Sequence, residues 1–311
     1  MQRRFWRCIQ IHQDNVTVIC TVYNEEANIE SLIESLLNQS LKPKEVIITD
    51  ADSTDQTWEI LEHLANKHLE LKVYSVPGNR SKGRNFAINK AKTKYIAVTD
   101  AGAVADFFWL ERITQPLLAG AAVSSGFYEP VFSNALEKAI AKMTIPSLKT
   151  VNPKTFLPSS RSVAFTKDAW ESVGGYPEEL SHNEDTPFDL SLKKQGYEFV
   201  FVPDALVYWK PRASFVDVYR QFQQYAYGDG EALIMLKDYL LIFARYLLLL
   251  VYPYGTVFGL ILWLLRLLKD FRKCQSLYLI PLRFIIDFAD MVGFIKGMKV
   301  AWTKWRKKQS S

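Results

Sequence analysis

Two short runs of β-branched and aromatic residues in the first part of this 311-residue chain each lead to an aspartate. The first, from Glu45 to Asp50, is EVIITD, and the second, from Lys94 to Asp106, is KYIAVTDAGAVAD, in which Asp100 precedes small residues. Such runs predict buried strands whose carboxyl ends are open to a ligand. Because ligands of open α/β sheets bind beyond these ends, Asp50 and Asp100 are expected to share one crevice. Alternatively, each aspartate only caps a turn or a helix.

Strands and helices are expected to alternate over the first hundred residues. The runs at Val16–Val22, Glu45–Asp50 and 71–76 predict strands, and the segments between them have the apolar spacing of helices. This order predicts an α/β fold with an open, mainly parallel sheet, right-handed crossovers and helices on both faces. Further on, we expect a cationic loop over 77–83 with a helix from Arg84, an irregular region over 133–158, and two short strands after a helix that stops at Gly196.

Charge and cysteine content indicate the compartment. The net charge is +5, and basic residues of the last third flank apolar segments, a pattern that suits anionic lipid headgroups better than a nucleic-acid groove. The three cysteines, Cys8, Cys20 and Cys274, are odd in number and scattered, which argues against a disulfide framework and a zinc site. The basic N-terminus has no apolar run of signal-peptide length, so we expect the part that follows to be cytoplasmic.

The segment from Tyr239 to Leu268 is far more apolar than a globular surface helix. It exceeds the length of about 20 residues that one membrane span requires, but Pro253, Tyr254 and Gly255 interrupt it. A straight span would also carry the basic residues 266–273 across the membrane, against the usual distribution of Lys and Arg. A hairpin or two interfacial helices is therefore the preferred arrangement.

A further apolar segment, Leu277 to Met298, contains Arg283, Asp287 and Asp290, which predicts an amphipathic interfacial helix rather than a span. The alternative for both apolar segments is a soluble helical core bundle. Together they predict a membrane-associated helical region over residues 231–311, following a catalytic domain over residues 1–230.

Three segments resemble family-2 glycosyltransferases of the GT-A fold. These are VTVICTVYNEEANIESLIESLLNQSLKPKEVIITDADSTDQT from Val16, GRNFAINKAKTKYIAVTDAGA from Gly83, and NEDTPFDLSLKKQGYEFVFVPDA from Asn183. They occur in the family's order within residues 16–230, and their combination makes the resemblance specific. The resemblance implies a GT-A sheet and a nucleotide-sugar donor, and the membrane-associated C-terminus is similar to that of members with lipid-linked or polymeric acceptors.

The resemblance also implies roles for individual residues on the donor side. Asp50 matches the acid that accepts a hydrogen bond from the nucleotide base, for which a strand-end carboxylate is suited. Arg80 and Lys82 can offer positive charge to the diphosphate. The residues expected around the base and ribose are Thr21, Tyr23 and Glu25.

The central motif departs from the family pattern. Members generally have Asp-x-Asp, whose second acid binds a divalent cation, whereas this chain has Asp100, Ala101 and Gly102. Mg²⁺ or Mn²⁺ often takes only one or two protein carboxylates together with water and substrate phosphates, so Asp100 alone is retained as a weak metal ligand. Asp106 is an alternative ligand, although capping the next turn is its simpler role.

Acceptor-side residues follow in the last resembling segment and after it. Asp185 matches the family's catalytic base, with Glu184 beside it, because an inverting transfer needs a carboxylate to take the proton of the acceptor hydroxyl. Asp185 could instead only cap the helix that follows. Residues just before the apolar region, namely Arg220, Gln224 and Tyr225, together with the segment 227–230, are expected to line the acceptor channel or contact the diphosphate, or else to pack structurally.

The leading hypothesis is thus an inverting, hexosyl-type glycosyltransferase with a nucleotide-sugar donor, a UDP-sugar by preference, and a lipid-linked or glycan acceptor at the cytosolic membrane face. Its expected partners include membrane lipids and exclude nucleic acid. The second hypothesis is a catalytically silent relative that acts as a binding or assembly subunit, and the incomplete Asp-x-Asp motif keeps it open. A nucleotidyltransferase is less favoured, because no glycine-rich phosphate loop follows the first strand.

Overall fold

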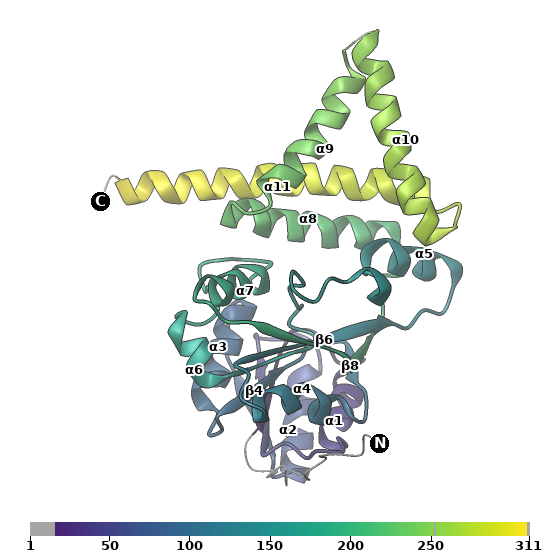
Figure 1. Ribbon diagram of the computed structural model, residues 1–311. Helices are drawn as coiled ribbons and strands as arrows, with labels where there is room; N and C mark the ends of the chain where they lie inside the picture. Colours follow the sequence, from purple (N-terminus) through teal and green to yellow (C-terminus); the bar gives the residue numbers. More distant parts are fainter. Residues whose placement is uncertain (1–15, 252, 310–311) are drawn as a thin grey trace, which may run out of the picture. The chain divides into compact units, whose positions relative to one another are not determined.

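The computed structural model describes residues 16–251 and 253–309 (Figure 1). Cys8 and His12 therefore lie outside the described residues. The chain divides into two compact units. The first comprises the chain up to Tyr128, Pro153–Gly175 and Asp189–Tyr208, and the second comprises Glu129–Asn152, Tyr176–Phe188 and the chain from Trp209 onward.

An eight-stranded sheet forms the centre of the first unit, in the order β3-β2-β1-β4-β7-β6-β8-β5. The pairs β3-β2, β2-β1 and β1-β4 are parallel, whereas β7 is antiparallel to β4 and β6 is antiparallel to β7. The strands are β1 (Val16–Val22), β2 (Glu45–Asp50), β3 (Leu71–Ser75), β4 (Tyr95–Val98), β5 (Ala103–Ala105), β6 (Val123–Pro130), β7 (Val163–Thr166) and β8 (Phe199–Trp209).

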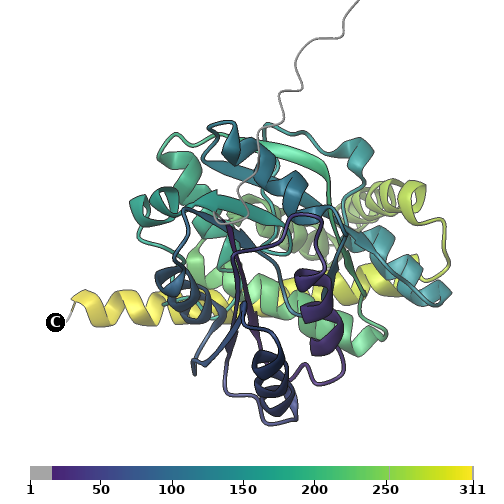
Figure 2. The ribbon, with the colours of Figure 1, turned by 90° about the horizontal axis from the view of Figure 1, so that it is seen from below.

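Helices cover both faces of this sheet (Figures 1 and 2). Side chains alternate along a strand, so Val18 of β1 joins a buried cluster with helices on one face, while Thr21 points to the other face, where Gly83 of α3 approaches it. The predicted α/β fold with an open, mainly parallel sheet is confirmed. The helices of this unit are α1 (Ile29–Leu37), α2 (Thr57–Lys67), α3 (Arg80–Lys90), α4 (Trp109–Leu118) and α6 (Lys167–Ser172). Helix α7 (Asp185–Lys194) begins in the second unit, to which its residues up to Phe188 belong, and its remaining residues belong to the first.

The second unit is helical. Two of its helices, α8 (Phe215–Ala232) and α11 (Leu279–Gln309), pack side by side (Figure 1). Glycines allow this close approach, because a Cβ at Gly293 or Gly297 of α11 would clash with backbone carbonyl oxygens of α8. A helical hairpin extends from this pair, and its arms are α9 (Leu236–Leu249) and α10 (Tyr254–Cys274). The remaining helix is α5 (Ala135–Thr144), with a short 3₁₀ helix at Leu148–Thr150.

Charged residues inside the apolar C-terminal helices form a buried network. Asp287 accepts hydrogen bonds from Arg245 at 3.1 Å and Tyr246 at 3.0 Å, and it pairs with Arg283 at 2.9 Å. Arg283 also contacts Asp270 of α10 at 3.2 Å. The charges of Arg283 and Asp287 thus face neighbouring helices rather than water, and they fasten the hairpin to α11.

Local differences from the sequence expectations have identifiable causes. The predicted loop over 77–83 is wrong at its end, because Asn79 caps the backbone N–H of Lys82 and starts α3 at Arg80. The expected irregular region over 133–158 contains α5, capped by Asn134, because its prolines all lie after the helix. The two short strands expected after Gly196 form the single strand β8, which tolerates Pro203.

Within the described ranges, no helix combines the length and the apolar character that crossing a lipid bilayer requires. α9 ends at Leu249 and α10 begins at Tyr254, close to the predicted interruption at Pro253.

Gly83 provides a test of the packing between α3 and the sheet. A Cβ at this position would lie 2.6 Å from Oγ1 of Thr21 and 2.8 Å from Oγ1 of Thr49. Helix propensity alone favours Gly83→Ala by about 1 kcal/mol, whereas overpacking a buried contact costs about 1–3 kcal/mol. We expect a net loss of about 1 kcal/mol in urea unfolding, while the exposed α3 control Asn89→Ala is neutral or slightly stabilising. Stabilisation by Gly83→Ala would contradict the observed packing.

Candidate active site

The loops that follow β1 and β2 are fastened to each other at the carboxyl edge of the sheet. Asn24 has a left-handed backbone (φ 53°), and its side-chain oxygen accepts the N–H of Thr54 at 2.8 Å, while its own N–H donates to Oγ of Ser53 at 2.8 Å. Non-glycine residues in this conformation are often held in place at ligand sites. These contacts preorganise the surface on which the sequence predicts the nucleotide base.

Asp50 lies at the end of β2, opposite Val22 of β1, and is buried. Its two carboxylate oxygens accept hydrogen bonds from the N–H of Ser53 at 2.9 Å and from the hydroxyl of Ser53 at 2.5 Å. The turn-capping alternative is therefore realised. Each carboxylate oxygen has a second lone pair, so a hydrogen bond from a base would be made in addition to this turn.

The other predicted donor residues of the first unit differ in exposure. Thr21 is half-buried and shares a hydrogen bond with Thr49 at 2.9 Å, whereas Tyr23 is exposed. Glu25 donates its N–H to Thr57 at 2.7 Å. Arg80 and Lys82 are exposed in the first turn of α3, so both side chains are accessible to an anionic ligand.

Asp100 lies two residues beyond β4 and pairs with Arg84 of α3 at 2.8 Å. The side chain of Arg84 is only 3% exposed and that of Asp100 is 25% exposed. Burial acts to raise the pKa of Asp100, but Arg84, Arg161 and Arg80 outweigh this effect, so the pKa lies below its ordinary value. Asp100 is thus an ionised carboxylate surrounded by positive charge.

Arg161 is a residue that the sequence analysis missed. It belongs to the loop before β7, contributes to the low pKa of Asp100, and its guanidinium lies 5.1 Å from the ring centroid of Tyr128. No local motif marks it, since the pairing of β7 with β4 brings this distant segment to the same region of the first unit.

The residues at the central motif match only a partial cation site. Among the described residues, no group of three or more His, Cys, Asp or Glu side chains is arranged to hold a metal ion. Asp100 supplies one carboxylate, already paired with Arg84, and a Cβ at Gly102 would lie 3.8 Å from Oε2 of Glu25. This donor set fits an ion held mainly by a diphosphate and water, and does not fit a site built by protein ligands alone.

The predicted base lies in the second unit. Asp185 is the first residue of α7 and is half-buried, whereas Glu184 is buried. Asn183 precedes them with a left-handed backbone (φ 56°). The N–H of Thr186 donates to Oδ1 of Asp185 at 3.2 Å, so Asp185 also contributes to the first turn of its helix. Of the two acids, Asp185 is the one more accessible to a substrate.

The predicted acceptor residues lie on exposed positions of α8. Within the described residues, Arg220 forms one ion pair, with Asp217 at 3.8 Å. Its side chain is 71% exposed. Gln224 is exposed, and the hydroxyl of Tyr225 accepts a hydrogen bond from Gln221 at 2.8 Å. Nothing in these contacts fixes the three side chains on a common ligand.

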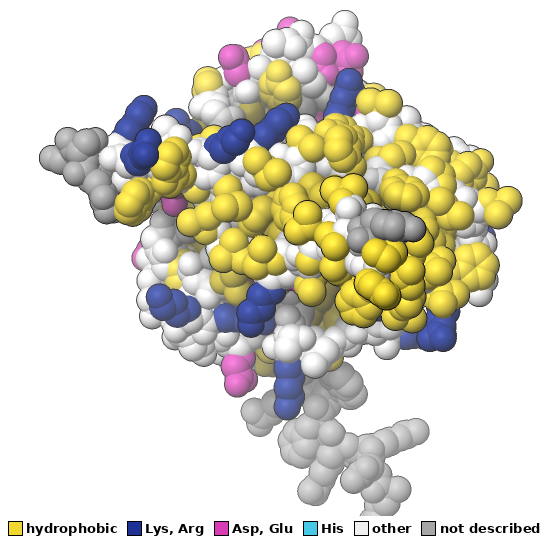
Figure 3. All heavy atoms as spheres, turned by 90° about the horizontal axis from the view of Figure 1, so that it is seen from above, with side chains coloured by type: hydrophobic (Ala, Val, Ile, Leu, Met, Phe, Trp, Pro, Cys, Tyr) yellow, Lys and Arg dark blue, Asp and Glu magenta, His cyan; other side chains and the backbone are white. Residues whose placement is uncertain are grey.

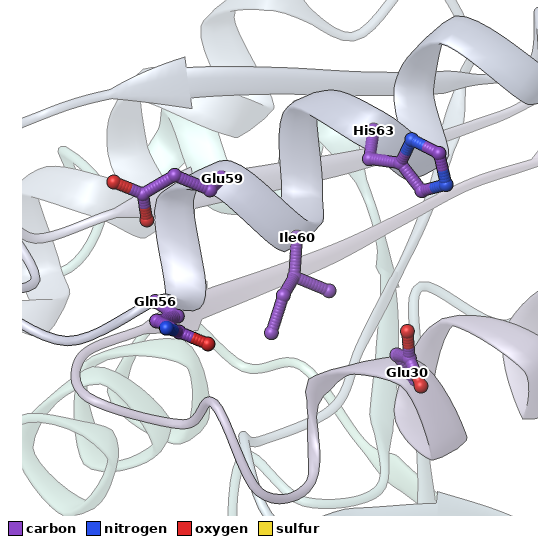
Figure 4. A pocket seen from close by; sticks show the side chains of 5 residues that line it. All are labelled: Glu30, Gln56, Glu59, Ile60 and His63. Atoms are coloured by element: carbon purple, nitrogen blue, oxygen red, sulfur yellow. The ribbon is translucent and has the colours of Figure 1, made fainter.

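A surface groove between α1 and α2 has a volume of about 440 Å³ (Figure 4). It contains none of the predicted site residues, and the side chains that line it are mostly exposed and polar. The groove is therefore not a candidate for the sugar-transfer site. Its lining residues are Glu30, Gln56, Glu59, Ile60 and His63.

The first unit is an α/β domain with a mainly parallel sheet and with acids at or just beyond strand ends, where ligands of open α/β sheets bind. The model of glycosyl transferase family group 2 matches residues 127–289, more than half of the chain, and that of glycosyl transferase family 2 matches residues 17–167. The chain therefore belongs to the family-2 glycosyltransferases, and it is a glycosyltransferase.

Three relatives illustrate the range of the family. The succinoglycan biosynthesis protein ExoA of Rhizobium meliloti (strain 1021) is 29% identical over 71% of this chain and 70% of the relative. The UDP-Glc:alpha-D-GlcNAc-diphosphoundecaprenol beta-1,3-glucosyltransferase WfaP of Escherichia coli is 36% identical over 30% of this chain and 36% of the relative. A dolichyl N-acetyl-alpha-D-glucosaminyl phosphate glycosyltransferase of Methanococcus voltae is 25% identical over 91% of this chain and 97% of the relative.

Solved structures support the fold. The mannosyltransferase PcManGT of Pyrobaculum calidifontis, in complex with GDP-Man and Mn²⁺, has a TM-score of 0.52 at 17% identity and covers 96% of this chain and 75% of its own. Residues 1–349 of S. aureus TarS, in complex with UDP, have a TM-score of 0.51 at 18% identity and cover 94% and 92%. The predicted GT-A fold is confirmed.

The pair of Arg84 and Asp100 predicts a specific pH dependence. The pKa of Asp100 is lowered in the folded protein, so the pair's stabilisation is complete above the unfolded value near 3.9 and is lost as the pH falls through the folded value. We expect Asp100→Asn to lower the free energy of unfolding by about 2 kcal/mol at pH 7, less than for a fully buried pair.

This deficit should shrink below about pH 4 in denaturant titrations followed by tryptophan fluorescence. Asp204→Asn is the matched control, because Asp204 is an exposed aspartate of the same unit. A deficit that stays constant down to pH 3 would show that ionised Asp100 does not stabilise the fold.

Proposed function

We propose that this protein is an inverting glycosyltransferase that moves a hexosyl group from a nucleotide-sugar, a UDP-sugar by preference, to a lipid-linked or glycan acceptor. The observation that carries the proposal is the half-buried Asp185 at the start of α7, in a chain that belongs to the family.

The reaction needs a base on the acceptor and charge neutralisation on the leaving group. In an inverting transfer, the acceptor oxygen forms a bond to the anomeric carbon as the bond from that carbon to the diphosphate oxygen breaks. Asp185 would take the proton of the acceptor hydroxyl, and the nucleoside diphosphate would leave with the electron pair. Buried Glu184 would support Asp185 rather than meet the substrate.

Cationic side chains would stabilise the charge that develops on the diphosphate. Arg80 and Lys82 are exposed at the start of α3, and a helix N-terminus itself favours anions. A divalent cation, Mg²⁺ or Mn²⁺, would add charge neutralisation when bound, with Asp100 as its protein ligand. Because Gly102 replaces the second acid, we propose weaker dependence on this cation than in relatives with a full Asp-x-Asp.

The relatives support this choice of donor and acceptor. WfaP has a UDP-Glc donor and a diphosphoundecaprenol-linked acceptor in its name, and ExoA is named for succinoglycan biosynthesis. Thr21, Tyr23, Glu25 and Asp50 would then hold the base and ribose, and Arg220, Gln224 and Tyr225 would face the acceptor side.

We further propose that residues 231–311 associate with the cytosolic face of a membrane, while residues 1–230 act as the cytoplasmic catalytic domain. The hairpin of α9 and α10 supports this, because its turn exposes Leu247, Leu250 and Tyr254. Figure 3 shows a broad hydrophobic surface on the face that carries the hairpin, with Lys and Arg at its margins.

The distribution of charge along this hairpin suits one leaflet of an anionic bilayer. Lys237 lies in the first turn of α9 and Lys273 in the last turn of α10, so basic residues are at the base of the hairpin and apolar residues at its turn. The 14 residues of α9 span about 21 Å, enough to reach the middle of a hydrocarbon core about 30 Å thick. The basic residues would then meet lipid headgroups.

The alternative function is a catalytically silent assembly subunit. The missing second acid at Gly102 favours it, whereas the accessible Asp185 favours an enzyme. Transfer and hydrolysis assays over a panel of nucleotide-sugars, with and without membrane lipid extract, distinguish the two.

Asp185→Asn should separate catalysis from donor binding. Asparagine keeps the shape and the helix-start hydrogen bond but cannot take a proton, so we expect the transfer rate to fall about 10²- to 10⁴-fold. Donor affinity, measured by calorimetry, should change by less than about twofold, because the base contacts the acceptor.

Asp50→Asn is the matched variant on the donor side, and it should weaken donor affinity more than turnover. A near wild-type transfer rate for Asp185→Asn would pass the role of base to Glu184 or remove it from both acids.

A second test addresses membrane association. Leu250 is 80% exposed at the hairpin turn, and Leu69 is 93% exposed in the first unit. Leu250→Ser should lower the partition coefficient into phosphatidylglycerol-containing vesicles about tenfold, since burying a leucine contributes about 1.5–3 kcal/mol. Leu69→Ser should leave co-sedimentation unchanged. Equal partition of both variants would contradict insertion of the hairpin.

A further inference from the structure

The segment of α8 from Gly228 to Glu231 contains two buried acids that the proposed chemistry leaves unused. Asp229 is 9% exposed and Glu231 is 7% exposed. The sequence suggested that residues 227–230 line the acceptor channel, contact the diphosphate or pack structurally. The side chains of the two acids contact Ser181, Asn183, Tyr239 and Lys304. All four residues belong to the second unit, which also holds the loop that leads to Asp185.

Asp229 connects that loop to α9. Its Oδ1 accepts a hydrogen bond from the side-chain amide of Asn183, and its Oδ2 accepts one from the hydroxyl of Tyr239 at 2.6 Å. Burial raises the pKa of Asp229, and the two hydrogen bonds act in the opposite direction. Asn183 has the left-handed backbone directly before Glu184, so its side-chain contact helps to fix the direction in which the chain enters α7.

Glu231 connects the same loop to α11. Its Oε2 accepts the N–H of Ser181 at 2.9 Å, and its Oε1 pairs with Nζ of Lys304 at 2.7 Å. Lys304 also donates to the carbonyl oxygen of Glu179 at 2.8 Å. One side-chain pair therefore holds the loop at two backbone positions.

The glycines between and beside these acids remove the space that a side chain would need. A Cβ at Gly228 would clash with the carbonyl oxygen of His182, and a Cβ at Gly230 would clash with that of Phe294 in α11. Successive positions of α8 thus contact the loop and α11 in turn. The ring of His182 also lies against Tyr227 at a centroid distance of 5.9 Å.

We propose that Asp229 and Glu231 are positioning residues for Asp185, and that through them α9 and α11 hold the catalytic loop in its working conformation. This inference rests on the proposed role of Asp185 as the base. Neither acid is assigned a contact with substrate. A displacement of about 1 Å at a reacting group can cost about 10²-fold in rate, so loss of this support should reduce turnover while leaving donor binding intact.

The first experiment compares Asp229→Ala with Asp229→Asn in the full chain. Alanine removes the carboxylate that accepts hydrogen bonds from Asn183 and Tyr239. We therefore expect kcat, normalised to the concentration of donor-binding sites, to fall about tenfold to hundredfold, while the KM for the donor stays within about twofold of the wild-type value. Asparagine should recover most of kcat, because its oxygen accepts from Tyr239 and its amide donates to Asn183 once the latter amide is flipped. Asp238→Ala, at an exposed position of α9, is the control.

The second experiment measures the loop itself by amide hydrogen exchange, independently of activity. The N–H of Ser181 should exchange at least about tenfold faster in Glu231→Ala and in Asp229→Ala than in the wild type or Asp238→Ala. Tyr239→Phe removes the contact of Asp229 with α9 but keeps its contact with Asn183, so kcat should fall by less than in Asp229→Ala.

The outcomes separate the two proposals. If the wild type transfers no sugar, the proposed function fails, and the exchange experiment still decides whether the loop is held. Unchanged exchange at Ser181, or unchanged kcat in Asp229→Ala of an active enzyme, would overturn the positioning role. A parallel loss of donor affinity would do the same, because it would indicate a general structural defect.

Discussion

The parallel pairing of β1 with β2 on one side and β4 on the other is the constraint on which the donor side depends. Its register places Val22 opposite Asp50 and Ile19 opposite Val98, so the chain leaves the strands at one edge of the sheet. A shift by one residue would move every side chain to the opposite face. Such a shift would take Thr21 away from Gly83 of α3 and Val18 out of the apolar cluster on the other face, so these contacts favour the observed register. The loops after the strands inherit their positions from this register.

Just beyond β4, the negative charge of Asp100 is balanced by the positive charge of nearby arginines. Asp100 would repel a diphosphate if it stood alone, yet Arg84 lies buried beside it and Arg161 adds to the positive field. The family resemblance implies a second acid at the position of Gly102, where it would be a cation ligand. In this chain the same region has an excess of arginine over carboxylate, which is consistent with neutralising a diphosphate largely through side chains.

Helices and strands that are determined by the local pattern of apolar residues could be predicted from the sequence. The apolar spacing of α1 and the β-branched run of β2 predicted both elements with their buried residues. Tertiary information was needed elsewhere: α5 is a helix because its prolines follow it, and Arg161 reaches Asp100 only through strand pairing. The charges of Arg283 and Asp287 suggested an interfacial helix, but their partners on α9 and α10 could not be inferred from one segment.

The site residues divide in the same way. Asp50 and Asp185 follow recognisable motifs, and their placement at a strand end and a helix start agrees with those motifs, although their roles stay predictions. Asp229 lay in the segment 227–230 that the sequence singled out, but its contact with Asn183 could not be inferred, since that residue is 46 residues away and the contact exists only after α8 folds against the loop.

Alternation of acids and glycines in α8 has a physical logic of its own. A buried carboxylate is costly unless its oxygens are fully satisfied, and Asp229 and Glu231 each meet that condition with two donors from different elements. Gly228 and Gly230 allow the backbones to approach closely enough for those contacts. Replacing a glycine would separate the backbones and break the contacts of the acids, and replacing an acid would leave the close approach at the glycines without those hydrogen bonds. Residues 228–231 therefore act together to connect the C-terminal helices to the loop before Asp185.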